Sequence, residues 1–116
     1  MPARQANILV ADDEIFIREG LQEALQKPDY AVATAADGNQ ARQLLAERDF
    51  HLVILDLRMP GPSGMELLEE IREQHADTQC IILTAHGNVT TAVEALRKGA
   101  YDFVTKPVDL ALSLIH

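Results

Sequence analysis

The sequence has 116 residues, the length of one domain, and is long enough to bury a core without disulfides or structural metal. Hydrophobic residues make up 47% and charged residues 24%, a composition that excludes an intrinsically disordered chain. The formal net charge of −8 argues against direct binding of nucleic acid, because an acidic surface repels the phosphate backbone.

The single cysteine, Cys80, excludes an intrachain disulfide, and its place in the run Cys80-Ile81-Ile82-Leu83 indicates a small buried side chain. No apolar run approaches the roughly 18 residues of a membrane span, and the amino terminus lacks the apolar stretch of a signal peptide. We therefore expect a cytoplasmic protein with no membrane association.

Five short apolar runs have the length and composition of buried strands. In chain order they cover residues 8–11, 30–35, 51–57, 80–84 and 101–105. The third run, Leu52-Val53-Ile54-Leu55, is apolar at every position. This is typical of a central strand in a parallel sheet that is covered on both faces.

A helical stretch follows each strand. In chain order these are a segment from about 14 to 26, one marked by Ala41, Leu44 and Leu45, one behind Ser63 that bears Leu67, Leu68 and Ile71, one after Gly87-Asn88 that bears Ala92, Val93 and Leu96, and one from Asp109 onward. Pro28 ends the first helix, Ser63 is the predicted N-cap of the third with Glu66 as its capping-box partner, and Gly99 is predicted to end the fourth in the left-handed conformation.

Strict alternation of five strands and five helices predicts an α/β fold, a doubly wound parallel sheet with helices on both faces. We expect residues 1–116 to form one domain, because we find no internal repeat or linker. The last helix stops at His116 after about two turns, which favours a piece of a longer polypeptide. A short terminal helix is the alternative.

Polar side chains come at the carboxyl ends of four predicted strands, where the functional crevice of an open α/β sheet lies. They are Asp12, Asp13 and Glu14 after the first strand, Asp56 at the end of the third, Thr84 at the end of the fourth and Lys106 after the fifth. We expect these side chains to meet at one edge of the sheet.

Each of these residue types suits phosphoryl chemistry. Clustered carboxylates repel one another unless a cation intervenes, and Mg²⁺ prefers such oxygen ligands. A carboxylate is also a competent nucleophile toward a phosphoryl group, whose oxygens a hydroxyl and an ammonium can bind. Taken singly, Asp12 and Asp13 could merely cap a helix, Thr84 could be a strand residue and Lys106 a solvated lysine. Their occurrence together favours a site.

Four segments of the sequence resemble the signature set of response-regulator receiver domains. They are Leu9-Val10-Ala11-Asp12-Asp13-Glu14, Val53-Ile54-Leu55-Asp56-Leu57-Arg58-Met59-Pro60 with Gly64, Ile82-Leu83-Thr84-Ala85, and Thr105-Lys106-Pro107. The stretches 84–89 and 98–103 are most similar to receivers of the nitrogen-regulator type. The resemblance spans essentially the whole chain and implies a flavodoxin-like sheet with strand order 2-1-3-4-5.

The resemblance also implies roles for individual residues. Asp56 would be the phosphoacceptor, Thr84 and Lys106 would bind the phosphoryl oxygens, and Thr84 would move on activation. Asp13 and Asp56 would hold Mg²⁺ directly, Asp12 would act through water, and the backbone carbonyl of Arg58 would add a ligand. Phe103 takes the aromatic switch position, where tyrosine is commoner. The Lys106-Pro107 bond becomes a candidate cis peptide.

The function implied is that of a switch in a two-component system. A sensor histidine kinase would donate its phosphoryl group to Asp56, and the face of the fourth helix, fifth strand and fifth helix would respond. That face would control self-association or a transcriptional output domain in the parent chain. The domain would be no enzyme beyond its own phosphotransfer and dephosphorylation.

Two other functions remain open at this point. A flavodoxin-like cofactor binder would share the architecture, but the acidic loop Asp12-Asp13-Glu14 would repel a cofactor phosphate. A phosphorylation-independent interaction module of the same fold would not need the complete set of acceptor, metal-binding and phosphate-binding residues.

Overall fold

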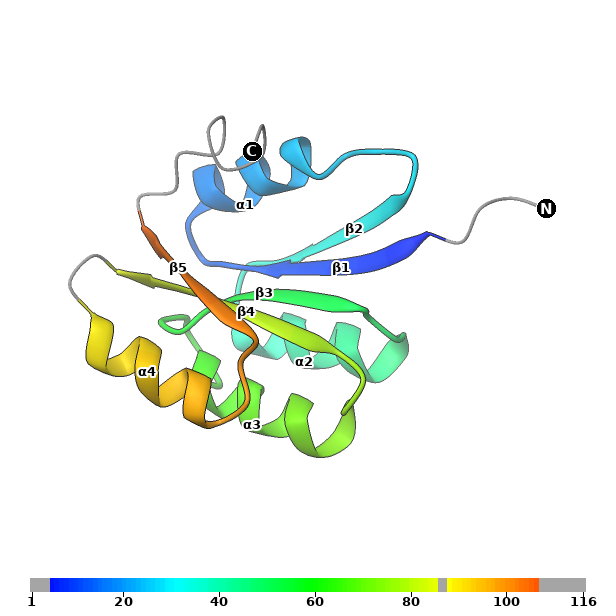
Figure 1. The fold of residues 1–116 in the computed structure, drawn as a ribbon. Coiled ribbons are helices and arrows are strands. Elements are labelled where there is room, and N and C mark those ends of the chain that lie inside the picture. The colour runs from blue at the N-terminus through cyan, green and yellow to red at the C-terminus, as the bar shows by residue number, and fades with distance from the viewer. Residues whose placement is uncertain (1–4, 86–87, 107–116) are drawn as a thin grey trace.

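The computed structural model describes residues 5–85 and 88–106, which form one parallel sheet with four helices around it (Figure 1). The strands are β1 (Ala6–Ala11), β2 (Tyr30–Ala35), β3 (Leu52–Asp56), β4 (Gln79–Ala85) and β5 (Asp102–Lys106). The helices are α1 (Ile15–Ala24), α2 (Gly38–Glu47), α3 (Gly64–Gln74) and α4 (Val89–Arg97). The strand order β2-β1-β3-β4-β5 confirms the predicted doubly wound fold.

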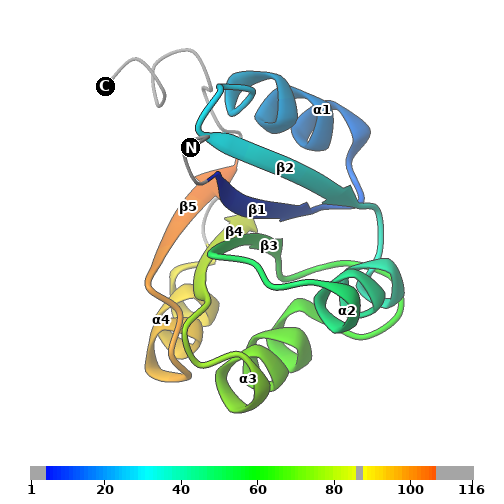
Figure 2. The same ribbon diagram turned by 90° about the vertical axis from the view of Figure 1, so that its right-hand side faces the viewer.

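The helices lie in two layers on opposite faces of the sheet. Figures 1 and 2 show α1 on one face, with α2, α3 and α4 on the other. Each face has its own apolar cluster. The smaller cluster joins Leu21 of α1 to Ile8, Val10, Ile54 and Leu83 of the central strands. The larger one gathers residues from α2, α3 and α4 over the other face. The two layers therefore clamp β1, β3 and β4 in the middle.

The predicted elements agree with the structure apart from shifts at their ends. Helix α1 ends at Ala24, before the stop that Pro28 predicts, and β5 begins at Asp102 instead of Tyr101. Cys80 is fully buried, as expected, and burial raises the pKa of its thiol to about 11. The predicted fifth helix and the Lys106-Pro107 peptide bond lie outside the described residues. Within those residues, no helix is long and apolar enough to cross a membrane.

Ser63 and Gly99 take their predicted places at helix ends, although among the described residues no bond from the Glu66 side chain completes the predicted capping box. The Ser63 hydroxyl accepts a hydrogen bond from the backbone amide of Glu66 (3.2 Å), so Ser63 is the N-cap of α3. At the end of α4, Gly99 has a φ of +107°. The Gly99 amide donates a hydrogen bond to the carbonyl oxygen of Leu96, and the Ala100 amide donates one to the carbonyl oxygen of Ala95. This is the pattern of a Schellman motif.

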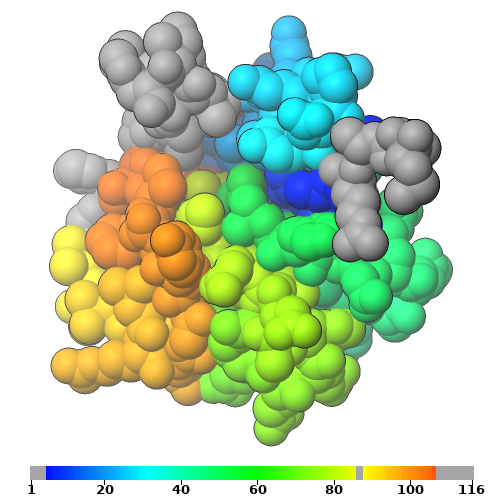
Figure 3. All heavy atoms as spheres, turned by 45° about the vertical axis from the view of Figure 1, so that its right-hand side comes forward, coloured from blue at the N-terminus to red at the C-terminus, as the bar shows by residue number. Residues whose placement is uncertain are grey.

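Helix α4 buries less of its apolar surface than its sequence suggests. Ala92 and Ala95 face the core, whereas Val93 and Leu96 are more than one third exposed. Because α4 covers the edge of the sheet at β4 and β5, small side chains allow a close approach and the larger ones stay outside. Figure 3 shows α3 and α4 side by side. An ion pair between Lys98 and Glu69 links the two helices.

Gly99→Ala should destabilise the domain by roughly 2 kcal/mol, because a left-handed φ is costly for alanine. The added Cβ would also lie 2.5 Å from Cδ of Arg72, whose guanidinium caps the carbonyls of His75 and Ala76. Gly20→Ala, inside α1, is the matched control and should gain up to about 1 kcal/mol. Urea unfolding measures the stability of both variants. Equal stability would contradict the assignment of Gly99 as the left-handed residue that ends α4.

Candidate functional site

The carboxyl ends of four strands bring the predicted site residues together. Asp12 follows β1, Asp56 ends β3, and Lys106 ends β5. Thr84 lies next to the end of β4 and is in register with Thr105. Asp12, Asp56 and Thr84 are buried, which is unusual for polar side chains and marks this edge of the sheet.

Asp12 and Asp56 are held in the same way. In each case Oδ1 accepts a hydrogen bond from the backbone amide two residues later, Glu14 for Asp12 (2.8 Å) and Arg58 for Asp56 (3.0 Å). The guanidinium of Arg18 in α1 also donates to the carbonyl oxygen of Asp12 (2.8 Å). These bonds fix both carboxylates and leave both Oδ2 atoms turned toward Lys106.

The Lys106 ammonium lies among three carboxylates. Its Nζ is 2.9 Å from Oδ2 of Asp12, 3.1 Å from Oδ2 of Asp56 and 3.6 Å from Oε2 of Glu14. Burial works to lower the pKa of Lys106, but the bonds to Asp12 and Asp56 outweigh it, so the pKa is raised. Lysine therefore keeps its charge here and partly offsets the acidic cluster.

One cation does not neutralise this cluster. Burial and the nearby Asp12 raise the pKa of Asp56, against the opposing influence of the Arg58 amide and Lys106. Oδ2 of Asp12 is fully buried and has Lys106 as its ion-pair partner, but among the described residues it makes no further hydrogen bond. The cluster thus has capacity for a further cation.

Asp12, Asp13 and Asp56 could supply that second cation with ligands. One carboxylate oxygen from each lies within 4.8 Å of the others. Asp13 is exposed and Asp56 is buried, so a metal ion could bind protein oxygens on one side and water on the other. Hard oxygen ligands and retained water are what Mg²⁺ prefers, so the donor set fits this metal.

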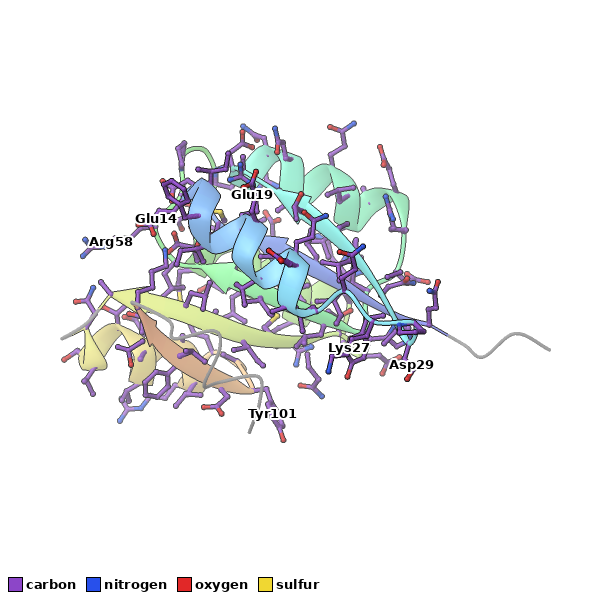
Figure 4. All side chains as sticks on the ribbon, turned by 90° about the horizontal axis from the view of Figure 1, so that it is seen from above. Glu14, Glu19, Lys27, Asp29, Arg58 and Tyr101 are labelled. Carbon is purple, nitrogen blue, oxygen red and sulfur yellow. The ribbon has the colours of Figure 1, made fainter. Side chains whose placement is uncertain are left out.

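An open cavity of about 360 Å³ lies over Asp56. Thr84, Ala85 and Lys106 line it on the side of β4 and β5, and Asn88 and Thr91 from the first turn of α4 complete the wall. In Figure 4, Glu14 and Arg58 lie at the same end of the sheet, opposite Lys27 and Asp29. The side chain of Arg58 is exposed, whereas its backbone lies beside Asp56.

Phe103 lies apart from this group, because it does not line the cavity. Its side chain is half-buried and packs against the larger apolar cluster. It therefore packs as an aromatic of β5 against the core, and its role as a switch stays a prediction.

Sequence reasoning missed three residues near the site: Arg18, Asn88 and Thr91. Each contacts the site only because a helix places its first turns beside a strand end. No local spacing reveals such a contact, although Arg18 and Thr91 lie in the first turns of α1 and α4 and Asn88 is the N-cap of α4.

Comparison with known proteins decides the family. Residues 8–114 match the sequence model of the response regulator receiver domain. The chain is a response-regulator receiver domain. Members of this family change state when they are phosphorylated. The chain is therefore a phosphoacceptor of two-component signalling and not a classical enzyme. Receiver domains bind Mg²⁺ in an acidic pocket and have histidine kinases as partners.

Three relatives place this receiver domain more closely. It is 42% identical to response regulator protein PilR of Pseudomonas aeruginosa over 88% of the chain and 23% of that protein. The receiver domain of NtrX from Brucella abortus is 39% identical, with a TM-score of 0.84 over 93% of this chain and 91% of the other. A Burkholderia pseudomallei response regulator, solved with a phosphorylated aspartic acid, calcium ion and citrate, is 27% identical, with a TM-score of 0.82 over 97% of this chain and 67% of that one.

These matches bear out the resemblance to nitrogen-regulator-type receivers. The chain spans about a quarter of the length of PilR, so what a whole regulator does remains a proposal for this protein.

Asp56→Asn should raise the Tm at neutral pH in metal-free buffer. The pKa of Asp56 is raised in the folded state, so its protonated carboxyl group contributes to stability. This contribution is fully present below the pKa of unfolded aspartate, about 3.9, and is lost as the pH rises through the folded-state pKa. Asparagine removes that loss, and each kcal/mol gained raises the Tm by about 4 °C.

The gain should shrink as the pH falls toward 4, which thermal melts across a pH series would follow. Asp77→Asn, at an exposed loop position, is the control and should change the Tm little at any pH. A lower Tm for Asp56→Asn at pH 7.5 would show that the Asp56 charge does not strain the site.

Proposed function

We propose that Asp56 is the phosphoacceptor and that Mg²⁺ binds to Asp13, Asp56 and the Arg58 carbonyl, with Asp12 acting through water. The observation that carries this proposal is the buried Asp56 carboxylate, flanked by two aspartates on one side and by Thr84 and Lys106 at an open cavity on the other. The phosphorylated aspartic acid of the Burkholderia relative supports the same chemistry.

In the proposed transfer, the bond between phosphorus and the kinase histidine breaks while an Asp56 oxygen bonds to phosphorus. Mg²⁺ would neutralise the charge that develops on the phosphoryl oxygens. Lys106 already lies 3.1 Å from Asp56, so its ammonium can pair with a phosphoryl oxygen by a small shift. The Thr84 hydroxyl, at the cavity wall, would bind another.

Loss of the phosphoryl group would use the same site. The cavity over Asp56 is open, so water can reach the acyl phosphate without a large movement of the chain. Attack by that water would return the carboxylate and release phosphate. The domain would thus catalyse only its own phosphorylation and dephosphorylation.

The output would leave through α4 and β5. Both border the cavity, since Thr91 of α4 and Asn88, its N-cap, line it and Lys106 ends β5. Exposed apolar side chains lie on their outer surfaces and at Tyr101 just before β5, namely Val89, Val93, Leu96, Tyr101 and Val104. Thr84 moving toward the phosphoryl group would pull the chain that leads into α4. We propose that this surface, with Phe103 behind it, controls self-association or an output domain.

This receiver domain would thus be the amino-terminal part of a longer cytoplasmic regulator that controls transcription. Its relative PilR is a response regulator about four times as long as the matched segment. The domain itself would not bind nucleic acid, because its net charge is −8.

The kinase would approach over the first turn of α1. Phe16 is 86% exposed and Ile15 is 49% exposed, directly after Asp13 and Glu14 at the rim of the cavity. Two large apolar side chains in water beside a phosphorylation site suit a protein donor that must bring its phosphohistidine within reach of Asp56.

Incubation with Mg²⁺ and a small phosphodonor should add one phosphoryl group to the protein, and intact-mass spectrometry would detect it. Asp56→Asn should remove the label, and Lys106→Ala should lower the rate by roughly 100-fold or more, since it loses a charge-assisted contact to the phosphoryl group. Equal labelling of Asp56→Asn would rule out Asp56. If the wild type neither takes the label nor binds beryllofluoride, a phosphorylation-independent interaction module becomes the better assignment.

Phe16→Ala should slow phosphorylation by the kinase without slowing the phosphoryl transfer to Asp56 from a small donor. Phosphorylation by a cognate histidine kinase should slow by about tenfold or more, as for an interface contact worth 1–2 kcal/mol. Labelling by the small phosphodonor should remain at the wild-type rate, because Phe16 does not touch Asp56. An equal loss with both donors would instead mean that the substitution disturbs the site.

A further inference from the structure

The loop between β3 and α3, residues 57–63, lies against the amino end of α2. The amide of Gly38 donates a hydrogen bond to the carbonyl oxygen of Pro60 (3.0 Å). The next residue of α2, Asn39, lies against Gly61, whose φ is +82°. One helix end therefore supports this loop at two neighbouring points.

The contact at Gly38 leaves no room for a side chain. A Cβ at this position would lie 2.2 Å from the carbonyl oxygen of Pro62 and 3.1 Å from its carbonyl carbon. The obstacle is backbone, so it cannot give way by a change of rotamer. The loop or the helix would have to move by nearly one ångström for that oxygen to reach even 3.0 Å.

This loop carries one wall of the proposed metal site. It begins directly after Asp56, and its second residue, Arg58, holds Oδ1 of Asp56 through its amide (3.0 Å). The carbonyl of Arg58 belongs to the same short segment. At the other end, Gly64 packs so closely that a Cβ there would lie 2.3 Å from the Asp56 carbonyl oxygen. A loop fixed at both ends transmits a shift at Pro62 to Arg58.

We propose that Gly38 is a positioning residue of the phosphorylation site: by letting the β3–α3 loop rest on α2, it sets the place of the Arg58 carbonyl relative to Asp13 and Asp56. The inference rests on the proposed Mg²⁺ site. It assigns a role at that site to α2, which supplies none of the site's side chains.

Comparing the binding of Mg²⁺ with that of Ca²⁺ distinguishes a positioning role of Gly38 from a general loss of stability. Mg²⁺ requires near-ideal octahedral geometry at 2.0–2.1 Å, whereas Ca²⁺ accepts flexible geometry at about 2.3–2.6 Å. A small displacement of one ligand therefore weakens Mg²⁺ binding more than Ca²⁺ binding. General loosening of the fold would weaken both by the same factor.

The test is calorimetric titration of Gly38→Ala and wild type with MgCl₂ and with CaCl₂, after circular dichroism has shown that the variant is folded. We expect the Mg²⁺ affinity to fall by about tenfold, as for supporting contacts behind metal ligands, and the Ca²⁺ affinity to fall by clearly less. Gly20→Ala, the same exchange inside α1, should leave both affinities unchanged. Asn39→Ala, which removes loop support without crowding, should show a smaller loss in the same direction.

An unchanged Mg²⁺ affinity in Gly38→Ala, or an equal fall for both cations, would overturn the role of Gly38. If Gly38→Ala does not fold, Asn39→Ala decides, and an unchanged ratio of the two affinities counts against the proposal. Absence of Mg²⁺ binding by the wild type would be a different result, since it would reject the proposed metal site itself.

Discussion

The repulsion among carboxylates at the carboxyl edge of the sheet is the constraint on which the rest of this structure depends. Asp12 and Asp56 are buried, and oxygens of Asp12, Asp13 and Asp56 lie within 4.8 Å of one another. Such a group is costly unless cations intervene. Lys106 supplies one positive charge, but burial, with a smaller contribution from the charge of Asp12, outweighs it and keeps the pKa of Asp56 raised. A bound metal ion would therefore reduce the repulsion among these carboxylates.

The fold holds the cluster together against this repulsion. β1 and β3 are neighbours at the centre of the sheet, so Asp12 and Asp56 extend from strands that are paired on both sides. Backbone amides hold one oxygen of each carboxylate, and the glycines at positions 38 and 64 let α2 and α3 come close to the loop after Asp56. The loop after Asp56 is thus held on two sides, by the amino ends of α2 and α3.

Most of the fold and the candidate site could be predicted because both follow from local pattern. Apolar runs located the strands, their alternation with helices required a parallel sheet, and the carboxyl ends of strands marked Asp12, Asp56, Thr84 and Lys106. Long-range contacts escaped prediction. The approach of Gly38 to Pro62 and the bond from Arg18 to Asp12 join segments whose spacing carries no signal. The apolar pattern of α4 likewise could not tell that alanines would face the core and Val93 the solvent.

The stabilisation of the folded domain by Mg²⁺ tests this account most directly. A ligand that binds the folded state alone raises stability by RT ln(1 + [L]/Kd), about 2.7 kcal/mol at a hundredfold excess over Kd. Thermal melts of the wild type should therefore show a Tm that rises with MgCl₂ concentration, and the rise should be absent in Asp13→Asn, whose exposed carboxylate can be removed without disturbing the core. A Tm that does not respond to Mg²⁺, or that responds equally in Asp13→Asn, would contradict the claim that the carboxylate cluster is built to receive a cation.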